Sequence, residues 1–376
     1  MNFRGINKKA SVVLCTATLL LTGCAVDQSG TAAAADDSNG DSSSAANRIW
    51  NDGGTVDIPE PAPGAGEGVH IMFTGFGQDN NLANAFAAAV IDEAELYDAT
   101  AEFAGPPTYD PVAQSTLLCD AATSGRYDAI VIQTIDSASI VECAKQAVAA
   151  GIHIVSIEFP LGADVTAEHL QIDGVVSQIR EDVVGIASAQ AEAAVEVCAG
   201  IDPCQVAVGW GVRSLAFDAA KVDPLLGILS AHENIDVVCQ GDAGYTEDTG
   251  RTVIADCLSA NPDLELVVMG SDEAAHGAEL AITGAGKSFG RGNDDIKIIG
   301  SYARKYGVQQ IIDDKWVMST FSRPNADGRA AVDLILAHIG GAEVPESINT
   351  QDLDRVGLTI FPETVGEVPN ILDLAY

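Results

Sequence analysis

Positively charged residues are scarce in this chain of 376 residues. Lysine and arginine total 19 against 54 aspartates and glutamates, which gives a formal net charge of -35. A surface of this sign repels phosphate backbones, so the composition excludes nucleic-acid binding as a main role. We interpret the acidity as a source of solubility, not as a binding feature.

Recognisable catalytic and metal-binding motifs are also missing. The six histidines are His70, His153, His169, His232, His276 and His338. None of them lies in a G-x-S-x-G or H-E-x-x-H context. No C-x-x-C pair occurs, which argues against zinc and against a thioredoxin-like redox site. We therefore expect no enzyme activity, no metal and no cofactor.

Long apolar runs are limited to the beginning of the chain. Residues 10–21 form an apolar stretch after Arg4, Lys8 and Lys9. It is shorter than the roughly 20 residues of a spanning helix and is typical of a signal peptide. It ends in Leu-Thr-Gly-Cys at 21–24, which resembles the bacterial lipobox. The resemblance implies a lipoprotein signal peptide over 1–23, a lipidated Cys24 and an extracytoplasmic, membrane-anchored protein. An ordinary leader with a chance cysteine is the alternative.

The segment that follows Cys24 offers little to bury. Residues 24–67 are rich in Ala, Ser, Gly, Asp and Thr until Ile58, and Pro59, Pro61 and Pro63 follow. Such a composition cannot offset its ordering entropy. We expect a flexible tether over 24–67 that ends in a stiffer Pro-rich piece.

Six cysteines remain beyond the leader. They are Cys119, Cys143, Cys198, Cys204, Cys239 and Cys257. An even number in an exported chain indicates disulfides, and six cysteines allow fifteen pairings. We expect sequence neighbours to pair, 119 with 143, 198 with 204 and 239 with 257, because each pair lies within one strand-and-helix neighbourhood.

Apolar strands alternate with helical patterns along the rest of the chain. The predicted strands are 69–73, 100–103, 129–133, 152–157, 206–209, 235–239, 264–269, 296–300 and 316–321. They are mostly continuous β-branched runs, as expected of parallel strands covered by helices on both faces. Nine or more strands with a break near 171–174 favour two doubly wound α/β sheets over one.

This order of elements resembles the periplasmic solute-binding proteins of the ribose and galactose type over about residues 68–342. Five segments carry the resemblance: 74–81, 151–158, 261–273, 298–302 and 320–328. It implies the type I periplasmic binding protein fold, two lobes joined by three crossover segments. The first lobe would comprise 68–174 plus 324–342, and the second 175–323 plus 343–376.

In that family the lobes close on a small ligand at the carboxyl edges of both sheets. The positions that match the family's contacts are Gln78, Asn80, Asn81, Glu158 and Phe159 in the first lobe, Lys221, Tyr245, Ser271, Asp272 and Tyr302 in the second, and Ser322 and Arg323 by a crossing. Sugar binders of this type usually carry an Asp-Arg pair at 158–159, an Asn at 271 and an Asp at 302. The departures favour a less polar or larger solute, such as a polyol derivative, a glycoside or a nucleoside-like molecule.

The resemblance implies a substrate-binding protein without chemistry of its own. It would capture a small polar solute, a sugar or sugar-like molecule, by lobe closure and deliver it as a monomer to the permease of an ABC importer. Two alternatives stay open. One is a solute-sensing receptor for a signalling membrane protein, and a remote one is an extracytoplasmic α/β enzyme.

Overall fold

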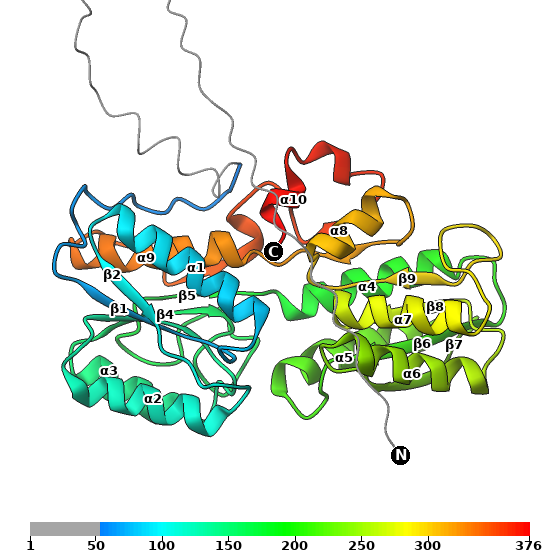
Figure 1. Ribbon diagram of the computed structural model, residues 1–376, viewed down its shortest axis with the longest axis horizontal. Coiled ribbons are helices and arrows are strands. Elements are labelled where there is room, and N and C mark those ends of the chain that lie inside the picture. The colour runs from blue at the N-terminus through cyan, green and yellow to red at the C-terminus, as the bar shows by residue number, and fades with distance from the viewer. Residues whose placement is uncertain (1–52) are drawn as a thin grey trace, which may run out of the picture. The chain divides into compact units, whose positions relative to one another are not determined.

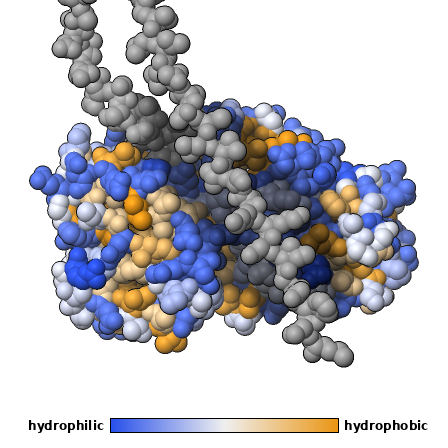
Figure 2. All heavy atoms as spheres, viewed as in Figure 1, coloured by the Kyte–Doolittle hydropathy of each residue, from blue (hydrophilic) through white to orange (hydrophobic). Residues whose placement is uncertain are grey.

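The computed structural model describes residues 53–376. The expected signal peptide, Cys24 and the tether up to residue 52 lie outside the described residues. Within 53–376, no helix combines the length and apolarity that a membrane crossing requires. On the face seen in Figure 2, hydrophilic residues extend over both ends, and hydrophobic residues gather in smaller groups between them.

A six-stranded parallel sheet forms the core of the first lobe. Its order is β11-β5-β4-β3-β1-β2, with β1 (His70–Thr74), β2 (Thr100–Phe103), β3 (Ala129–Gln133), β4 (His153–Glu158), β5 (Ser177–Arg180) and β11 (Ser347–Asn349). Helices α1 (Asn81–Leu96) and α9 (Pro324–Ile339) cover one face, and α2 (Pro111–Ser124) and α3 (Val141–Ala149) cover the other (Figure 1). In β1, Ile71 and Phe73 pack towards α1 and α9, whereas Met72 packs towards α2 and α3. Both faces of the strand are buried, as a continuous apolar run predicts.

A four-stranded parallel sheet forms the core of the second lobe. Its order is β7-β6-β8-β9, with β6 (Cys204–Trp210), β7 (Ile235–Asp242), β8 (Leu266–Met269) and β9 (Lys297–Ile299). Helices α6 (Glu247–Ala260), α7 (Asp272–Gly284) and α8 (Lys305–Ile312) pack on one face, and α4 (Val183–Val197) and α5 (Ala216–Ser230) on the other. This arrangement confirms the predicted fold class, two doubly wound parallel sheets.

The chain passes between the lobes three times. The first crossing follows β5, the second lies between β10 (Ser319–Thr320) and α9, and the third lies between β11 and β12 (Thr359–Ile360). β10 and β12 pair antiparallel beside the second lobe, and short turns η2 (Thr350–Asp352) and η3 (Val365–Glu367) precede the final helix α10 (Ile371–Leu374). The junction between the lobes is therefore formed by three segments that lie apart in the sequence.

The first sheet extends beyond the lobe boundaries expected from the sequence. β5 begins after residue 174 and pairs with β4, and β11 lies within 343–376 but pairs with β5. Their sequences, Ser-Gln-Ile-Arg and Ser-Ile-Asn, are mostly polar. They do not form the apolar runs by which buried strands are recognised. The predicted strand 316–321 is reduced to the two residues of β10.

The described end of the expected tether packs against the first lobe. The N–H of Thr55 donates to the Asp352 carbonyl at 2.8 Å, and the N–H of Gly66 donates to the Tyr97 carbonyl at 2.8 Å. Ile58 is only 3% exposed. Residues 53–67 are thus part of the folded domain, because Ile58 provides an apolar side chain that the lobe can bury.

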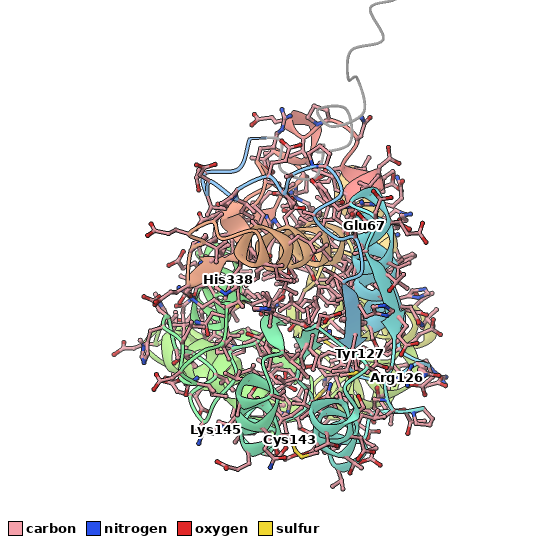
Figure 3. All side chains as sticks on the ribbon, turned by 90° about the vertical axis from the view of Figure 1, so that its left-hand side faces the viewer. Glu67, Arg126, Tyr127, Cys143, Lys145 and His338 are labelled. Atoms are coloured by element: carbon pink, nitrogen blue, oxygen red, sulfur yellow. A yellow bond between two sulfur atoms is a disulfide. The ribbon has the colours of Figure 1, made fainter. Side chains whose placement is uncertain are left out.

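All three predicted disulfides are present. Cys119–Cys143 joins α2 to α3 (Figure 3), Cys198–Cys204 joins the end of α4 to β6, and Cys239–Cys257 joins β7 to α6. Each bond links neighbouring elements of a single lobe. The disulfides therefore leave the two lobes free of covalent links across the cleft.

Helices α6 and α7 approach each other closely at two glycines. A Cβ atom at Gly277 would lie 2.1 Å from the carbonyl oxygen of Glu247, and one at Gly250 would lie 2.3 Å from that of Ala274. Both neighbouring atoms belong to the backbone, which cannot move away as a flexible side chain can. Glycine is therefore required for this helix pair.

We expect Gly277→Ala to lower the free energy of unfolding by about 1–3 kcal/mol, because the added methyl group forces α6 and α7 apart. Gly284 lies in the same helix, and a Cβ atom there would meet no other atom within 4 Å. Gly284→Ala is thus a matched control that should be neutral or stabilising by up to about 1 kcal/mol. Urea unfolding followed by circular dichroism measures both, and equal losses would contradict the packing argument.

Candidate ligand-binding site

A cavity of about 70 Å³ lies between the lobes at the carboxyl ends of their strands. The first lobe contributes Phe76, Asn80, Leu82, Tyr109 and Glu158, and the second contributes Phe217, Tyr245, Ser271, Glu273, Tyr302, Arg304 and Tyr376. Five of these, Asn80, Glu158, Tyr245, Ser271 and Tyr302, are predicted ligand residues. Open α/β sheets generally bind their ligands at this edge.

Glu158 is the buried carboxylate of the first-lobe wall. It ends β4 and is 2% exposed. The side chain of Gln133, at the end of the neighbouring strand β3, donates from Nε2 to Glu158 Oε2 at 2.5 Å. Burial raises the pKa of Glu158 well above its usual range, and the nearby Glu181 raises it further. An uncompensated negative charge is therefore costly at this position in the empty cavity.

Two buried glutamines hold this carboxylate in place. Gln133 Oε1 accepts the N–H of Phe76 at 3.2 Å, which directs its amide nitrogen towards Glu158. Gln114 donates from Nε2 to the carbonyl of Gln133 at 2.8 Å, and its Oε1 accepts the N–H of Ile135 at 2.8 Å. Neither glutamine was predicted, because the sequence does not show in which direction an amide side chain on a strand or helix points.

Two cavity residues have backbone conformations that are uncommon outside glycine. Glu158 has φ 65° and Tyr302 has φ 79°. Both lie in the left-handed region that non-glycine residues rarely adopt. Such residues cluster at functional sites, where the surrounding structure holds them in place.

Aromatic rings connect the lobes beside the cavity. Phe159 stacks on Phe217 of α5 with centroids 4.3 Å apart and planes at 17°. Phe76 lies 6.3 Å from Phe159 and 5.4 Å from Tyr109. Phe159 itself is buried and is not on the cavity wall. The structure therefore makes this predicted ligand residue a support for Phe76 and Phe217.

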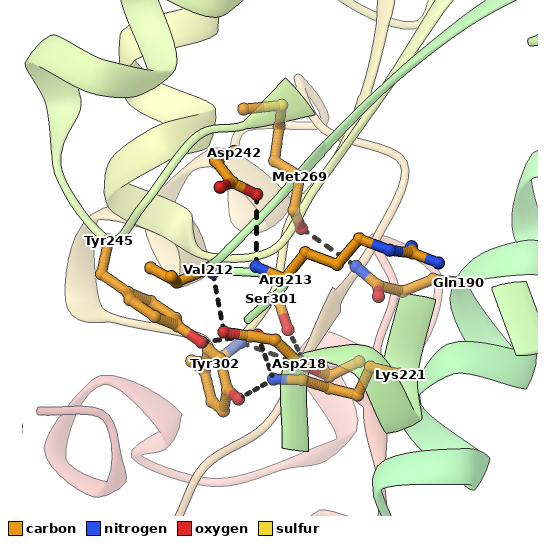
Figure 4. Close-up of polar contacts among 11 residues, drawn as sticks. Gln190, Val212, Arg213, Asp218, Lys221, Asp242, Tyr245, Met269, Ser301 and Tyr302 are labelled. Atoms are coloured by element: carbon orange, nitrogen blue, oxygen red, sulfur yellow. Dashed lines mark hydrogen bonds and ion pairs between the residues drawn. The ribbon is translucent and has the colours of Figure 1, made fainter. Parts of the chain in front are cut away.

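A charged network orients the second-lobe tyrosines (Figure 4). Lys221 donates from Nζ to the Tyr302 hydroxyl and lies 3.6 Å from Asp218 Oδ1. Asp218 also accepts the Tyr245 hydroxyl at 2.7 Å and the N–H of Val212 at 2.7 Å. Burial raises the pKa of Tyr245 well above its usual range, and Asp218 adds to the effect. Lys221 is not on the wall of this cavity, and it is bonded to the wall residue Tyr302.

Asp272 faces the interior of the second lobe. Its carboxylate accepts the N–H groups of Ser301 at 2.9 Å and Arg304 at 2.8 Å, and the Ser319 hydroxyl at 2.9 Å. It is 1% exposed, and burial raises its pKa to about 8. The structure does not place Asp272 on the cavity wall. Its neighbour Glu273 lies there instead.

The remaining predicted residues lie around the cavity. Ser271 caps α7 by accepting the N–H of Ala274 at 3.2 Å, and Asn80 caps α1 by accepting that of Ala83 at 3.0 Å. Gln78 and Asn81 are exposed and are not part of the wall. Ser322 and Arg323 are buried at the second crossing, and neither lines the cavity.

Several wall residues were not predicted. They are Phe76, Leu82, Tyr109, Phe217, Glu273, Arg304 and Tyr376. Glu273 forms an ion pair with Arg304, and the Arg304 guanidinium lies 4.6 Å from the ring centroid of Tyr376. No cluster of three or more metal-ligating side chains occurs among residues 53–376.

A family model described as a periplasmic binding protein domain matches residues 71–343. The chain belongs to this family. It is similar to the ribose import binding protein RbsB of Bacillus subtilis, with 27% identity over 222 residues. That match covers 59% of this chain and 66% of the relative, so it spans slightly less than two thirds of the relative's length.

Solved structures of the family share the fold. A periplasmic ribose ABC transporter protein from Conexibacter woesei has a TM-score of 0.64 at 18% identity and covers 80% of this chain and 95% of its own. An arabinose-transporter binding protein from Shewanella, bound to L-arabinofuranose, has a TM-score of 0.67 at 20% identity. The match covers 80% of this chain and 94% of that protein. A D-allose-bound protein from Actinobacillus succinogenes has a TM-score of 0.68 at 16% identity. The match covers 80% of this chain and 100% of that protein.

We expect Asp272→Ala to lower the free energy of unfolding by about 3 kcal/mol, because the N–H groups of Ser301 and Arg304 and the Ser319 hydroxyl lose their acceptor. Asp263, which is exposed in the same lobe, provides the control. Asp263→Ala should change stability by less than about 0.5 kcal/mol. Chemical unfolding of the two variants checks this. A variant at 272 with wild-type stability but weakened solute binding would contradict the structural role.

Proposed function

We propose that this protein is an extracytoplasmic substrate-binding protein that captures a small sugar or sugar-like solute and delivers it to an ABC importer. The observation that carries the proposal is the cavity between the lobes, whose wall combines a buried carboxylate, Glu158, with aromatic rings from both lobes. Carboxylates bind hydroxyl groups, and aromatic faces pack on the apolar face of a sugar ring. The names of the similar proteins, which include ribose, arabinose and allose binders, support it.

Capture requires the lobes to move. The cavity of about 70 Å³ is smaller than the roughly 300–1,000 Å³ of ordinary ligand pockets. A solute is therefore admitted only when the lobes separate, and closure would bring both walls into contact with the solute. The three crossings are the segments that would bend, as in hinged two-lobe proteins.

The proposal includes attachment to the membrane by lipid at Cys24. The basic start, the short apolar stretch at 10–21 and the lipobox-like ending support it. Acyl chains on Cys24, followed by the polar segment up to residue 52, would keep the domain near its permease without a spanning helix. The domain would act as a monomer.

Solute binding should produce a more compact protein. Titration calorimetry against a panel of pentoses, hexoses, polyols and nucleosides finds the solute, and small-angle scattering measures the radius of gyration with and without it. We expect Glu158→Ala to weaken binding by about tenfold or more, which corresponds to about 1.4 kcal/mol. The exposed Glu168, paired with Arg180, provides the control Glu168→Ala, which should bind normally. Unchanged dimensions on saturation would contradict closure.

Cys24 should be the acylated first residue of the mature protein. Mass spectrometry of the membrane fraction is expected to show a diacylated or triacylated peptide that begins at Cys24. Cys24→Ala should remove the protein from this fraction while its domain binds the solute as before. A mature chain that begins elsewhere and is free in the medium would contradict the anchor.

A further inference from the structure

The wall of the cavity is unusually aromatic. Six of its twelve residues are aromatic, Phe76, Tyr109, Phe217, Tyr245, Tyr302 and Tyr376. Aromatic residues make up only 5% of the whole chain. A neutral sugar needs one or two rings against its apolar face. A wall that is half aromatic also suits a cation, because the faces of aromatic rings carry negative electrostatic potential.

Three of these rings already bind cations of the protein. Lys221 Nζ lies 4.7 Å from the ring centroid of Tyr302 and 5.3 Å from that of Phe217. The Arg304 guanidinium lies over Tyr376. The described residues place no lysine or arginine over the rings of Phe76, Tyr109 and Tyr245. These rings, next to Glu158 on the wall, are available to a cation from the solute.

One of the two carboxylates on the wall has no ion-pair partner among the described residues. Of the two on the wall, Glu273 is paired with Arg304, whereas Glu158 has no ion pair in the described part of the chain. Lys221 is bonded to the Tyr302 hydroxyl and lies 3.6 Å from Asp218. Burial raises the pKa of Glu158 by more than the charge of Lys221 lowers it, so Lys221 does not compensate the carboxylate fully. A buried carboxylate without a cation is costly, and a positively charged group in the cavity would stabilise it.

The geometry points to a solute that carries an ammonium group: we propose a hydroxylated amine, such as an amino sugar or an aminocyclitol. The inference deepens the proposed function and rests on it. The ammonium would bind the Glu158 carboxylate among the rings of Phe76, Tyr109 and Tyr245. The hydroxyl groups would bind the polar side chains at the opposite side of the wall, Ser271 and the Glu273–Arg304 pair.

Matched pairs of compounds test the charge directly. Titration calorimetry at pH 7 compares D-glucosamine with D-glucose, D-galactosamine with D-galactose, and scyllo-inosamine with scyllo-inositol, with the N-acetyl derivatives as neutral amides. We expect the amine of at least one pair to bind tenfold or more tightly than its neutral partner and its N-acetyl derivative. Binding of the amine should weaken as the salt concentration rises.

Variants assign the preference to the wall. Glu158→Gln should reduce the preference for the amine to less than about twofold, whereas Glu168→Gln at the exposed control position should retain it. Tyr109 is 42% exposed and lies outside the buried core. Tyr109→Leu should weaken the amine at least threefold more than its neutral partner, and this readout is independent of how Glu158→Gln folds.

The outcomes separate this inference from the proposed function. Tight binding of neutral sugars or polyols without a preference for their amines overturns the ammonium proposal and leaves the solute-binding function intact. Failure of every amine to bind overturns it as well. The absence of compaction with any solute that does bind counts against the proposed function itself.

Discussion

The structure depends on how charged side chains are paired at the junction of the lobes, where the chain crosses three times and water is largely excluded. Arg323 of the second crossing is 2% exposed, and its Nε lies 3.0 Å from Asp354 Oδ1 of the third crossing. Its other nitrogens donate to the carbonyls of Phe321 and Gly357. A buried guanidinium is tolerated only when its charge is paired, and Asp354 supplies the opposite charge here.

This pairing joins one crossing to another and does not join lobe to lobe. Arg323 and Asp354 both belong to the connecting segments, so the proposed separation of the lobes would not require this ion pair to break. Asp327 at the start of α9 is held in the same region by the hydroxyl of Thr350, and burial raises its pKa to about 8. Buried polar groups are therefore concentrated where the second and third crossings meet.

The first crossing is connected directly to the candidate site. The N–H of Glu181, the first residue after β5, donates to the carbonyl of Glu158 at 2.9 Å. Glu158 and Arg180 are also register partners in the pairing of β4 with β5. If a solute binds the Glu158 carboxylate as proposed, it binds a residue whose backbone is hydrogen-bonded to the first crossing.

The sequence was sufficient for the elements whose signal is local. Buried strands such as β3 and β4 are apolar runs, and paired cysteines such as Cys198 and Cys204 are close along the chain, so both could be predicted. The direction in which a side chain points could not be predicted. Glu158 and Asp272 both lie where an apolar strand has just ended, yet one lines the cavity and the other accepts backbone N–H groups inside its lobe. Only the path of the loop at 301–304 distinguishes them.

The stacking of Phe159 on Phe217 is one contact that would oppose separation of the lobes. Stacked rings such as Phe159 and Phe217 contribute about 0.5–1.5 kcal/mol beyond the area that they bury. A bias of this size changes the ratio of closed to open molecules by roughly tenfold at most. Moving such an equilibrium almost completely to one side takes several kcal/mol more, and a solute supplies them only by binding the closed form more tightly. The proposed contacts of a solute with Glu158 on one side and with the second-lobe wall on the other would satisfy this condition, because both form only in the closed protein.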